Sequence, residues 1–261
     1  MNLSELASPL VGIAIDAGQK ILEVYHDESR FGEIDYKADD SPLTEADRLA
    51  NERIVSFLEN YWPDIPVLSE EGRDIPYEER KDWARFWLVD PLDGTKEFIN
   101  RNGEFTVNIA LIEGQQVVAG VVHVPVQGVT YFAAKGSGAW KYAEGAPRQQ
   151  LQAASFSMDQ AGLRVVCSRN HLSEATKAYI NALNQPEMVN MGSSLKLAKI
   201  AEGEADVYPR FGPTMEWDIG AAQIIVEEAG GQVLIHEVGT PLQYNKENLL
   251  NPFFMVYGQR K

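Results

Sequence analysis

Apolar residues recur at helical spacing at the start of the chain. Residues 3–25 carry them at intervals of three and four, and this period predicts an amphipathic helix. The polar stretch 27–42 that follows predicts a loop. Thr44 opens a second segment of helical period, which Trp62-Pro63-Asp64 ends because proline cannot continue a helix.

Short apolar runs bounded by turn residues come next, and they predict strands. Three consecutive runs separated by Gly114 and Gly128 predict an antiparallel meander. Strands then alternate with helices, which is typical of an α/β arrangement. The expected strands are residues 67–69, 86–90, 105–113, 116–124, 129–134, 163–167, 188–191, 206–208, 232–235 and 253–257. The expected later helices are residues 173–183, 194–201 and 217–229.

Residues 136–147 are rich in glycine and alanine and separate the two patterns. We therefore expect two subdomains, an α+β unit over residues 1–145 and an α/β unit over residues 146–261. A chain of 261 residues is long enough to bury a sizeable core in two such units.

The composition narrows the possible functions. With 38 acidic and 23 basic residues the formal net charge is −15, which argues against nucleic acid as a partner. The sequence shows no apolar run of membrane-spanning length and no signal-peptide pattern. One cysteine, Cys167, suits a reducing cytoplasm. Oligomeric state and peripheral attachment to the inner membrane stay open.

Two aspartates follow the buried run 86–89. Pro91 is expected to end regular pairing, so Asp90 and Asp93 should lie at the exposed tip of the strand, where Gly94 lets the backbone turn. Two carboxylates and a nearby carbonyl form an oxygen-rich group of the kind that binds Mg²⁺. The alternative is an ordinary turn with aspartate caps.

Two further acidic clusters favour the metal interpretation. The run 67–69 ends in Glu70-Glu71, and Asp218 lies where a helix is expected to begin. Together with Asp-Pro-Leu-Asp-Gly-Thr, these clusters resemble the signature of the lithium-sensitive, magnesium-dependent phosphomonoesterases of the inositol monophosphatase superfamily. The resemblance spans residues 47–231 and implies a mixed α/β fold, a layered α-β-α-β-α sandwich.

The resemblance also implies roles for particular residues. The metal ligands would be Glu70, Asp90, Asp93, Asp218 and the backbone carbonyl of Leu92, holding two or three Mg²⁺ ions. Two ions about 3.5–4 Å apart can stabilise both the attacking and the leaving oxygen of an in-line displacement. Asp47 and Thr95 would form the catalytic pair that activates water. Glu71 is either an outer neighbour of the metals or solvated.

Two of these residues have capping alternatives. Asp47 lies three residues after Thr44, which is the spacing of a capping box. Thr95 begins a short expected helix, residues 95–100, and its hydroxyl could be the N-cap. The N–H groups of Gly94 and Thr95 at that helix start would attract phosphate.

The second half of the chain resembles one branch of the superfamily, the CysQ-type bacterial 3'(2'),5'-bisphosphate nucleotidases. The resemblance implies removal of the 3'-phosphate of adenosine 3',5'-bisphosphate, giving AMP, with 3'-phosphoadenylyl sulfate as a further substrate and sulfur metabolism as the setting. Arginine and lysine suit the second phosphate. The expected substrate-binding residues are Gly94, Thr95, Ser168, Arg169, Ser194, Lys196, Arg210 and Asp218.

Other phosphatase chemistries lack their motifs. There is no Cys-x5-Arg loop around Cys167, no Asp-x-Asp pair, no paired zinc-binding histidines and no phosphate-binding Gly-x4-Gly-Lys loop. Two alternatives remain, an inositol monophosphatase and a catalytically silent regulator that binds metal or phosphate on the same fold.

Overall fold

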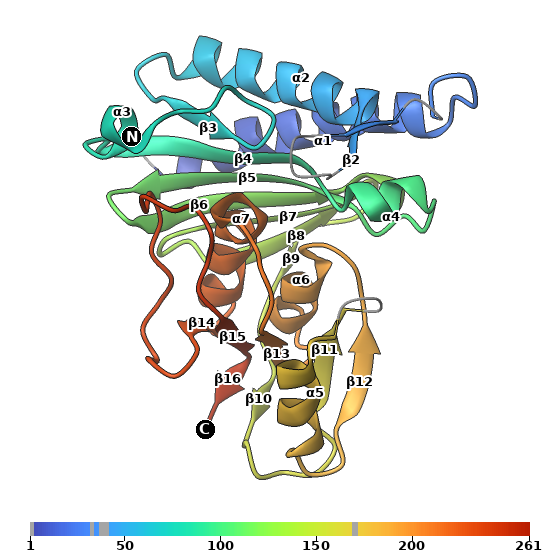
Figure 1. Ribbon diagram of the computed structural model, residues 1–261, viewed down its shortest axis with the longest axis vertical. Coiled ribbons are helices and arrows are strands. Elements are labelled where there is room, and N and C mark those ends of the chain that lie inside the picture. The colour runs from blue at the N-terminus through green and yellow to red at the C-terminus, as the bar shows by residue number, and fades with distance from the viewer. Residues whose placement is uncertain (1–2, 32–33, 37–41, 169–171) are drawn as a thin grey trace.

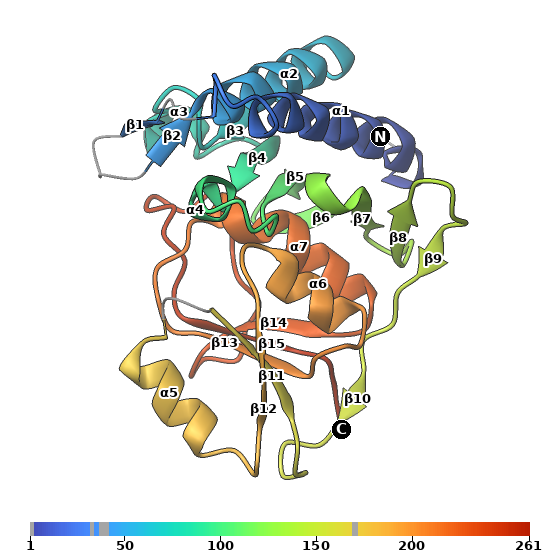
Figure 2. The same ribbon diagram turned by 90° about the vertical axis from the view of Figure 1, so that its right-hand side faces the viewer.

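The computed structural model describes the whole chain except residues 1–2, 32–33, 37–41 and 169–171. It consists of five layers in the order α-β-α-β-α, as the views from two sides show (Figures 1 and 2). The layered α/β sandwich expected from the sequence is thereby confirmed. No helix among the described residues has the length and apolar character needed to cross a membrane.

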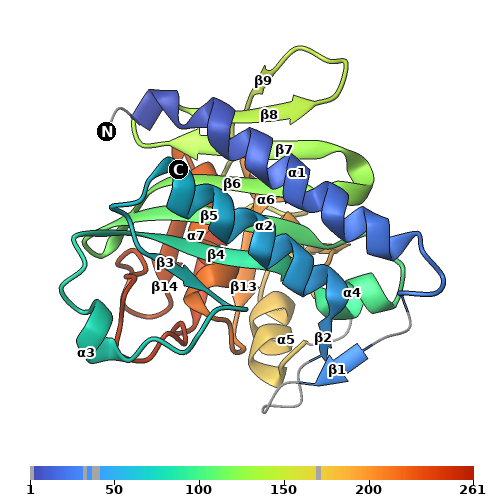
Figure 3. The same cartoon turned by 90° about the horizontal axis from the view of Figure 1, so that it is seen from above.

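The first two layers come from the N-terminal half. Helices α1 (Ala7–Tyr25) and α2 (Glu45–Tyr61) lie across a seven-stranded sheet, α1 over its middle and α2 nearer β3 and β4 (Figure 3). The strands follow the chain in spatial order, and all neighbours are antiparallel except β3 and β4. They are β3 (Val67–Ser69), β4 (Arg85–Asp93), β5 (Thr106–Glu113), β6 (Gln116–Val124), β7 (Val129–Ala134), β8 (Ala139–Ala143) and β9 (Gln149–Gln150).

The middle layer consists of α6 (Leu195–Ala201) and α7 (Glu216–Glu228), which pack between the two sheets (Figure 2). Helix α7 approaches β6 so closely that a Cβ on Gly120 would lie 2.5 Å from the Ala221 carbonyl oxygen. The second sheet has the order β12-β11-β13-β15-β14, and α5 (Glu174–Asn181) lies on its outer face. Its strands are β11 (Arg164–Cys167), β12 (Glu187–Asn190), β13 (Val207–Arg210), β14 (Gln232–Ile235) and β15 (Phe254–Tyr257).

The remaining elements are short. Strand β1 (Ile34–Tyr36) pairs with β2 (Pro42–Thr44), and β10 (Ser155–Phe156) pairs with β16 (Gln259–Arg260). The short helices are η1 (Leu3–Glu5), α3 (Tyr77–Arg80), α4 (Thr95–Ile99) and η2 (Pro125–Gln127).

The side chains of β4 point alternately into two hydrophobic cores, so this one strand lines both of them. On β4, Trp87 and Val89 join the core under α1 and α2, whereas Phe86 and Leu88 join the core around α6 and α7. Successive side chains of a strand point to opposite faces, so a strand covered on both sides is apolar throughout. This is why the run 86–89 carries no polar residue before Asp90.

The structure confirms the two long N-terminal helices, the meander β5–β7 and the alternating elements of the second half. Their ends lie within about two residues of the expected ones, except that α1 begins at Ala7 rather than at residue 3. The expectation of a loop over residues 27–42 is wrong, because this stretch contains β1. Strand β8, hydrogen-bonded to β7, was not expected within residues 136–147. Both strands are short, with three residues in β1 and five in β8. The subdomain boundary at residues 145/146 stays a prediction.

Candidate active site

A bulge at the end of β4 brings two aspartates to one face of the sheet. Residues three apart on a regular strand point to opposite faces. Here Asp90 pairs with Asn108 and Asp93 with Thr106, so three steps on β4 match two on β5. The expectation that Pro91 ends the pairing is therefore wrong. The strand continues to Asp93 through a bulge, a feature that often redirects side chains near active sites.

Glu70 and Asp218 reach the same place from two other elements. Strand β3 runs parallel to β4, and the Glu70 N–H donates to the Val89 carbonyl at 3.0 Å, which sets Glu70 beside Asp90. Asp218 lies in the first turn of α7, where its carboxylate accepts from the Met215 N–H at 2.9 Å. The three acidic motifs are thus brought together.

Burial and mutual repulsion raise the pKa values of two of these carboxyl groups. Burial, followed by the charges of Glu70, Asp93 and Asp218, raises the pKa of Asp90 well above its usual value. Burial and then the charge of Asp93 raise the pKa of Asp218 to about 8. Like charges in a site of low polarity repel unless a cation neutralises them.

This donor set fits Mg²⁺, which prefers oxygen ligands and binds through carboxylates and substrate phosphate. In the described part of the chain, no three His, Cys, Asp or Glu side chains are arranged so that they could hold a metal ion as they stand. The Leu92 N–H donates to Asp90 Oδ1 at 3.1 Å, which holds the bulge. The assignment of these residues as ligands stays a prediction that the geometry supports.

The expected catalytic pair is joined by a hydrogen bond. Thr95 Oγ1 donates to Asp47 Oδ1 at 3.3 Å. The other oxygen, Asp47 Oδ2, accepts from the Thr44 N–H at 2.7 Å and from the Thr44 hydroxyl at 2.5 Å, so Asp47 also forms the capping box of α2. The two interpretations of Asp47 are compatible because each uses a different oxygen.

The alternative role of Thr95 as a helix N-cap is wrong. Gly94 occupies the N-cap position of α4 with φ +98°, a left-handed conformation that favours glycine, and Thr95 is the first helical residue. The Thr95 hydroxyl therefore interacts with Asp47. The hydroxyl donates its one proton to Asp47, and the lone pairs of its oxygen can then accept a proton from a water molecule in the cleft.

A small pocket of about 150 Å³ lies beside these groups. Its lining includes six residues expected to bind substrate, Gly94, Ser168, Ser194, Lys196, Arg210 and Asp218. Lys196 is only 8 % exposed, and burial lowers the pKa of its ammonium to about 8. Its Nζ lies 5.8 Å from the centre of the buried Tyr208 ring.

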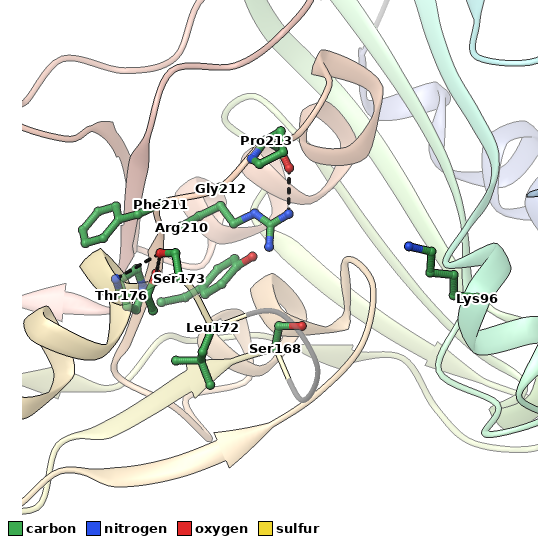
Figure 4. A pocket seen from close by; sticks show the side chains of 11 residues that line it. Lys96, Ser168, Leu172, Ser173, Thr176, Arg210, Phe211, Gly212 and Pro213 are labelled. Carbon is green, nitrogen blue, oxygen red and sulfur yellow. Dashed lines mark hydrogen bonds between the residues drawn. The ribbon is translucent and has the colours of Figure 1, made fainter. Parts of the chain in front are cut away.

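A second cavity of about 560 Å³ adjoins the first and shares Ser168, Tyr208 and Arg210 with it. Figure 4 shows the Arg210 guanidinium, which donates to the Pro213 carbonyl at 2.7 Å, on one side and Lys96 of α4 on the other. Arg169 lies outside the described residues. Lys96 was missed by the sequence analysis, and its signal was a cation directly after Asp-Gly-Thr.

The chain matches the model of the inositol monophosphatase family over residues 2–252. It is 47 % identical over 247 residues to the 3'(2'),5'-bisphosphate nucleotidase CysQ of Escherichia coli K12, covering 94 % of this chain and 96 % of that protein. It is 34 % identical to the CysQ nucleotidase of Haemophilus influenzae, covering 100 % and 96 % of the two chains.

Solved structures agree with the sequence comparisons. The crystal structure of CysQ from Bacteroides thetaiotaomicron superposes with a TM-score of 0.86 at 44 % identity, covering 98 % of each chain. An inositol monophosphatase from Thermotoga maritima shares the fold with a TM-score of 0.76 at 24 % identity, covering 95 % of this chain and 90 % of that one. The chain belongs to the inositol monophosphatase family, whose phosphatases are generally metal-dependent.

Proposed function

We propose that the protein is a Mg²⁺-dependent 3'(2'),5'-bisphosphate nucleotidase that removes the 3'-phosphate of adenosine 3',5'-bisphosphate. One observation carries the proposal. The carboxylates of Glu70, Asp90, Asp93 and Asp218 come together beside a hydrogen-bonded Asp47–Thr95 pair, and basic residues line the adjoining cavity. The high identity to CysQ nucleotidases over nearly the whole chain supports it.

In this proposal Glu70, Asp90, Asp93, Asp218 and the Leu92 carbonyl hold two or three Mg²⁺ ions. When bound, the ions would neutralise phosphate charge and lower the pKa of water. The 3'-phosphate would lie in the small pocket, against the N–H groups of Gly94 and Thr95.

The Asp47–Thr95 pair moves the proton. Thr95 Oγ1 accepts a proton from the attacking water while its own proton passes to Asp47 Oδ1, which lies 3.3 Å away. The water oxygen attacks phosphorus in line, and the bond between phosphorus and the 3'-oxygen breaks. The 3'-oxygen takes up a proton from solvent, and Asp47 later releases to solvent the proton that it received. The products are AMP and inorganic phosphate, and no covalent phosphoenzyme forms.

The second phosphate and the base would occupy the larger cavity. Arg210 offers a planar guanidinium that suits a phosphate, with Lys96 and Lys196 adding positive charge. Leu172 and Phe211 provide apolar surface for the base. Tyr208 is 2 % exposed and packs edge-on against Phe254, which supports a buried strand tyrosine over one that stacks on adenine.

A panel assay tests the proposal. Phosphate release would be measured with adenosine 3',5'-bisphosphate, 3'-phosphoadenylyl sulfate and inositol monophosphate, each with Mg²⁺ and with excess chelator. We expect the highest kcat/KM for a bisphosphorylated nucleotide, no turnover in chelator, and inhibition by millimolar lithium. A higher kcat/KM for inositol monophosphate would assign the alternative activity, and no release from any substrate would assign a silent regulator.

The proposal includes a small phosphorylated nucleotide as the substrate and a cytoplasmic location. The buried, unpaired Cys167 supports a reducing compartment. Fractionation of cells that produce the protein would test both the location and any peripheral attachment to the inner membrane.

A further inference from the structure

A network of buried polar side chains lies beside Asp93. Thr106 and Asn108 on β5 have no exposed surface, and Ser194, just before α6, is 2 % exposed. The β4 bulge pairs Thr106 with Asp93 and Asn108 with Asp90, so all four face the middle layer. Buried polar groups require hydrogen-bond partners, and these side chains bond to one another.

Two hydrogen-bonded chains run from β5 to the same carboxylate oxygen. In the first, the Thr106 hydroxyl lies 2.7 Å from Ser193 Oγ, which donates to Asp93 Oδ2 at 2.6 Å. In the second, Asn108 Nδ2 donates to Ser194 Oγ at 2.9 Å, and Ser194 Oγ donates to Asp93 Oδ2 at 2.8 Å. Each hydroxyl has one proton, which is divided between two acceptors. Thr106 Oγ1 also lies 3.0 Å from Asn108 Oδ1, and Ser194 Oγ also lies 2.8 Å from the Asp218 carbonyl oxygen.

The backbone adds a third donor to that oxygen. The Ser194 N–H donates to Asp93 Oδ2 at 2.7 Å, in a turn where Ser193 has φ +49°, an uncommon conformation for a residue with a side chain. Gly192 lets the turn pack against α4 and Glu104, because a Cβ there would lie 2.8 Å from Glu97 Cγ and 3.1 Å from the Glu104 carbonyl oxygen. Three donor atoms thus lie within 2.8 Å of one oxygen, whereas Asp93 Oδ1 has no donor among the described residues.

We propose that Thr106 and Asn108 are positioning residues that act through Ser193 and Ser194 to fix the Asp93 carboxylate with Oδ1 toward the divalent cation. The proposal rests on the proposed function, because it assumes that Asp93 is a metal ligand. It also gives the Ser194 hydroxyl a role in holding Asp93. Partners that orient a ligand typically change metal affinity by about 10–100-fold when they are lost.

The test compares two threonines of one sheet. Thr106→Val removes a buried hydroxyl beside Asp93, and Thr106→Ser keeps it. The matched control is Thr130→Val, because Thr130 on β7 is 1 % exposed and its hydroxyl lies 2.8 Å from His123 Nδ1, outside the site. Mg²⁺ would be titrated into each purified variant while the melting temperature is followed, with calorimetry as a second readout of metal binding.

We expect Thr106→Val to need about tenfold more Mg²⁺ for half of the thermal stabilisation. Thr106→Ser should match the wild type, and Thr130→Val should melt earlier without metal but keep the wild-type Mg²⁺ midpoint. Asn108→Ala breaks the other chain and gives an independent result if Thr106→Val does not fold. Equal midpoints in the wild type, Thr106→Val and Asn108→Ala would overturn the positioning role alone. A wild type that neither binds Mg²⁺ nor needs it for turnover would overturn the proposed function as well.

Discussion

The two sides of the candidate active site are built in different ways. On the acidic side, Asp90 and Asp47 are each 1 % exposed and sit where sheet register and a helix cap fix them. On the basic side, Arg210 is the half-buried last residue of β13 and Lys96 lies exposed on a five-residue helix. Buried, over-determined groups suit chemistry, and exposed groups on short elements suit recognition of a substrate. Substitutions on the two sides should therefore alter different kinetic constants.

The largest effect is expected on the acidic side. Asp90→Asn should lower kcat about a thousandfold, because several kcal/mol of charge stabilisation depend on the metal ligands. Without metal, the Asp90→Asn variant should melt no earlier than the wild type, because one of four mutually repelling carboxylates is gone. Asp206→Asn is the control, because Asp206 is 3 % exposed and pairs with Arg164 in the other sheet. It should melt earlier and keep kcat, and a low kcat in this control would undo the comparison.

Asp47→Asn should lower kcat by about 10²–10⁴ with an unchanged melting temperature, because asparagine still accepts from the Thr44 N–H but takes no proton. Thr95→Ala should have a similar effect, and the double variant should be little worse than either single one. Thr95→Ser, which keeps the hydroxyl, should stay active. Near-normal kcat with a lower melting temperature in Asp47→Asn would reduce Asp47 to a helix cap.

On the basic side the Michaelis constant should change instead. Arg210→Gln should raise KM for adenosine 3',5'-bisphosphate by about 10–100-fold, the equivalent of a charged hydrogen bond, with kcat little changed. The KM of this variant for adenosine 3'-monophosphate, which lacks the second phosphate, should equal that of the wild type. Arg148→Gln is the control, because Arg148 is exposed and stacks on Trp140 far along the first sheet. An equal rise in KM for both nucleotides would place the second phosphate elsewhere.

The smallest effect is expected from pH. Burial lowers the pKa of Lys196 to about 8, so its charge is present below that pH and is lost as the pH rises through it. We expect kcat/KM for the bisphosphate to fall by less than about tenfold between pH 7 and 9. Lys196→Arg keeps its charge and should remove this decline. An identical decline in both proteins would assign the titration to another group.

The same contrast explains what the sequence could predict. The carboxylates lie next to buried strands whose apolar runs can be recognised in the sequence. Their motifs therefore predicted the candidate active-site residues before the fold was known. The bulge was hidden, because nothing local to Pro91 says that β5 continues to pair with Asp93. Lys96 was missed because its position depends on how α4 faces the cavity across from Arg210. The Thr106–Asn108 network depends on a turn 85 or more residues away, and no local pattern reports such contacts.

The most direct test of this division of labour is to identify which phosphate leaves. Adenosine 3',5'-bisphosphate would be incubated with the protein and Mg²⁺, and the products followed by phosphorus NMR. Chemistry at the carboxylates with the second phosphate held near Arg210 predicts AMP that carries only a 5'-phosphate, together with inorganic phosphate. Accumulation of adenosine 3'-monophosphate would contradict the account, because the phosphate assigned to the basic side would then be the one that reacts.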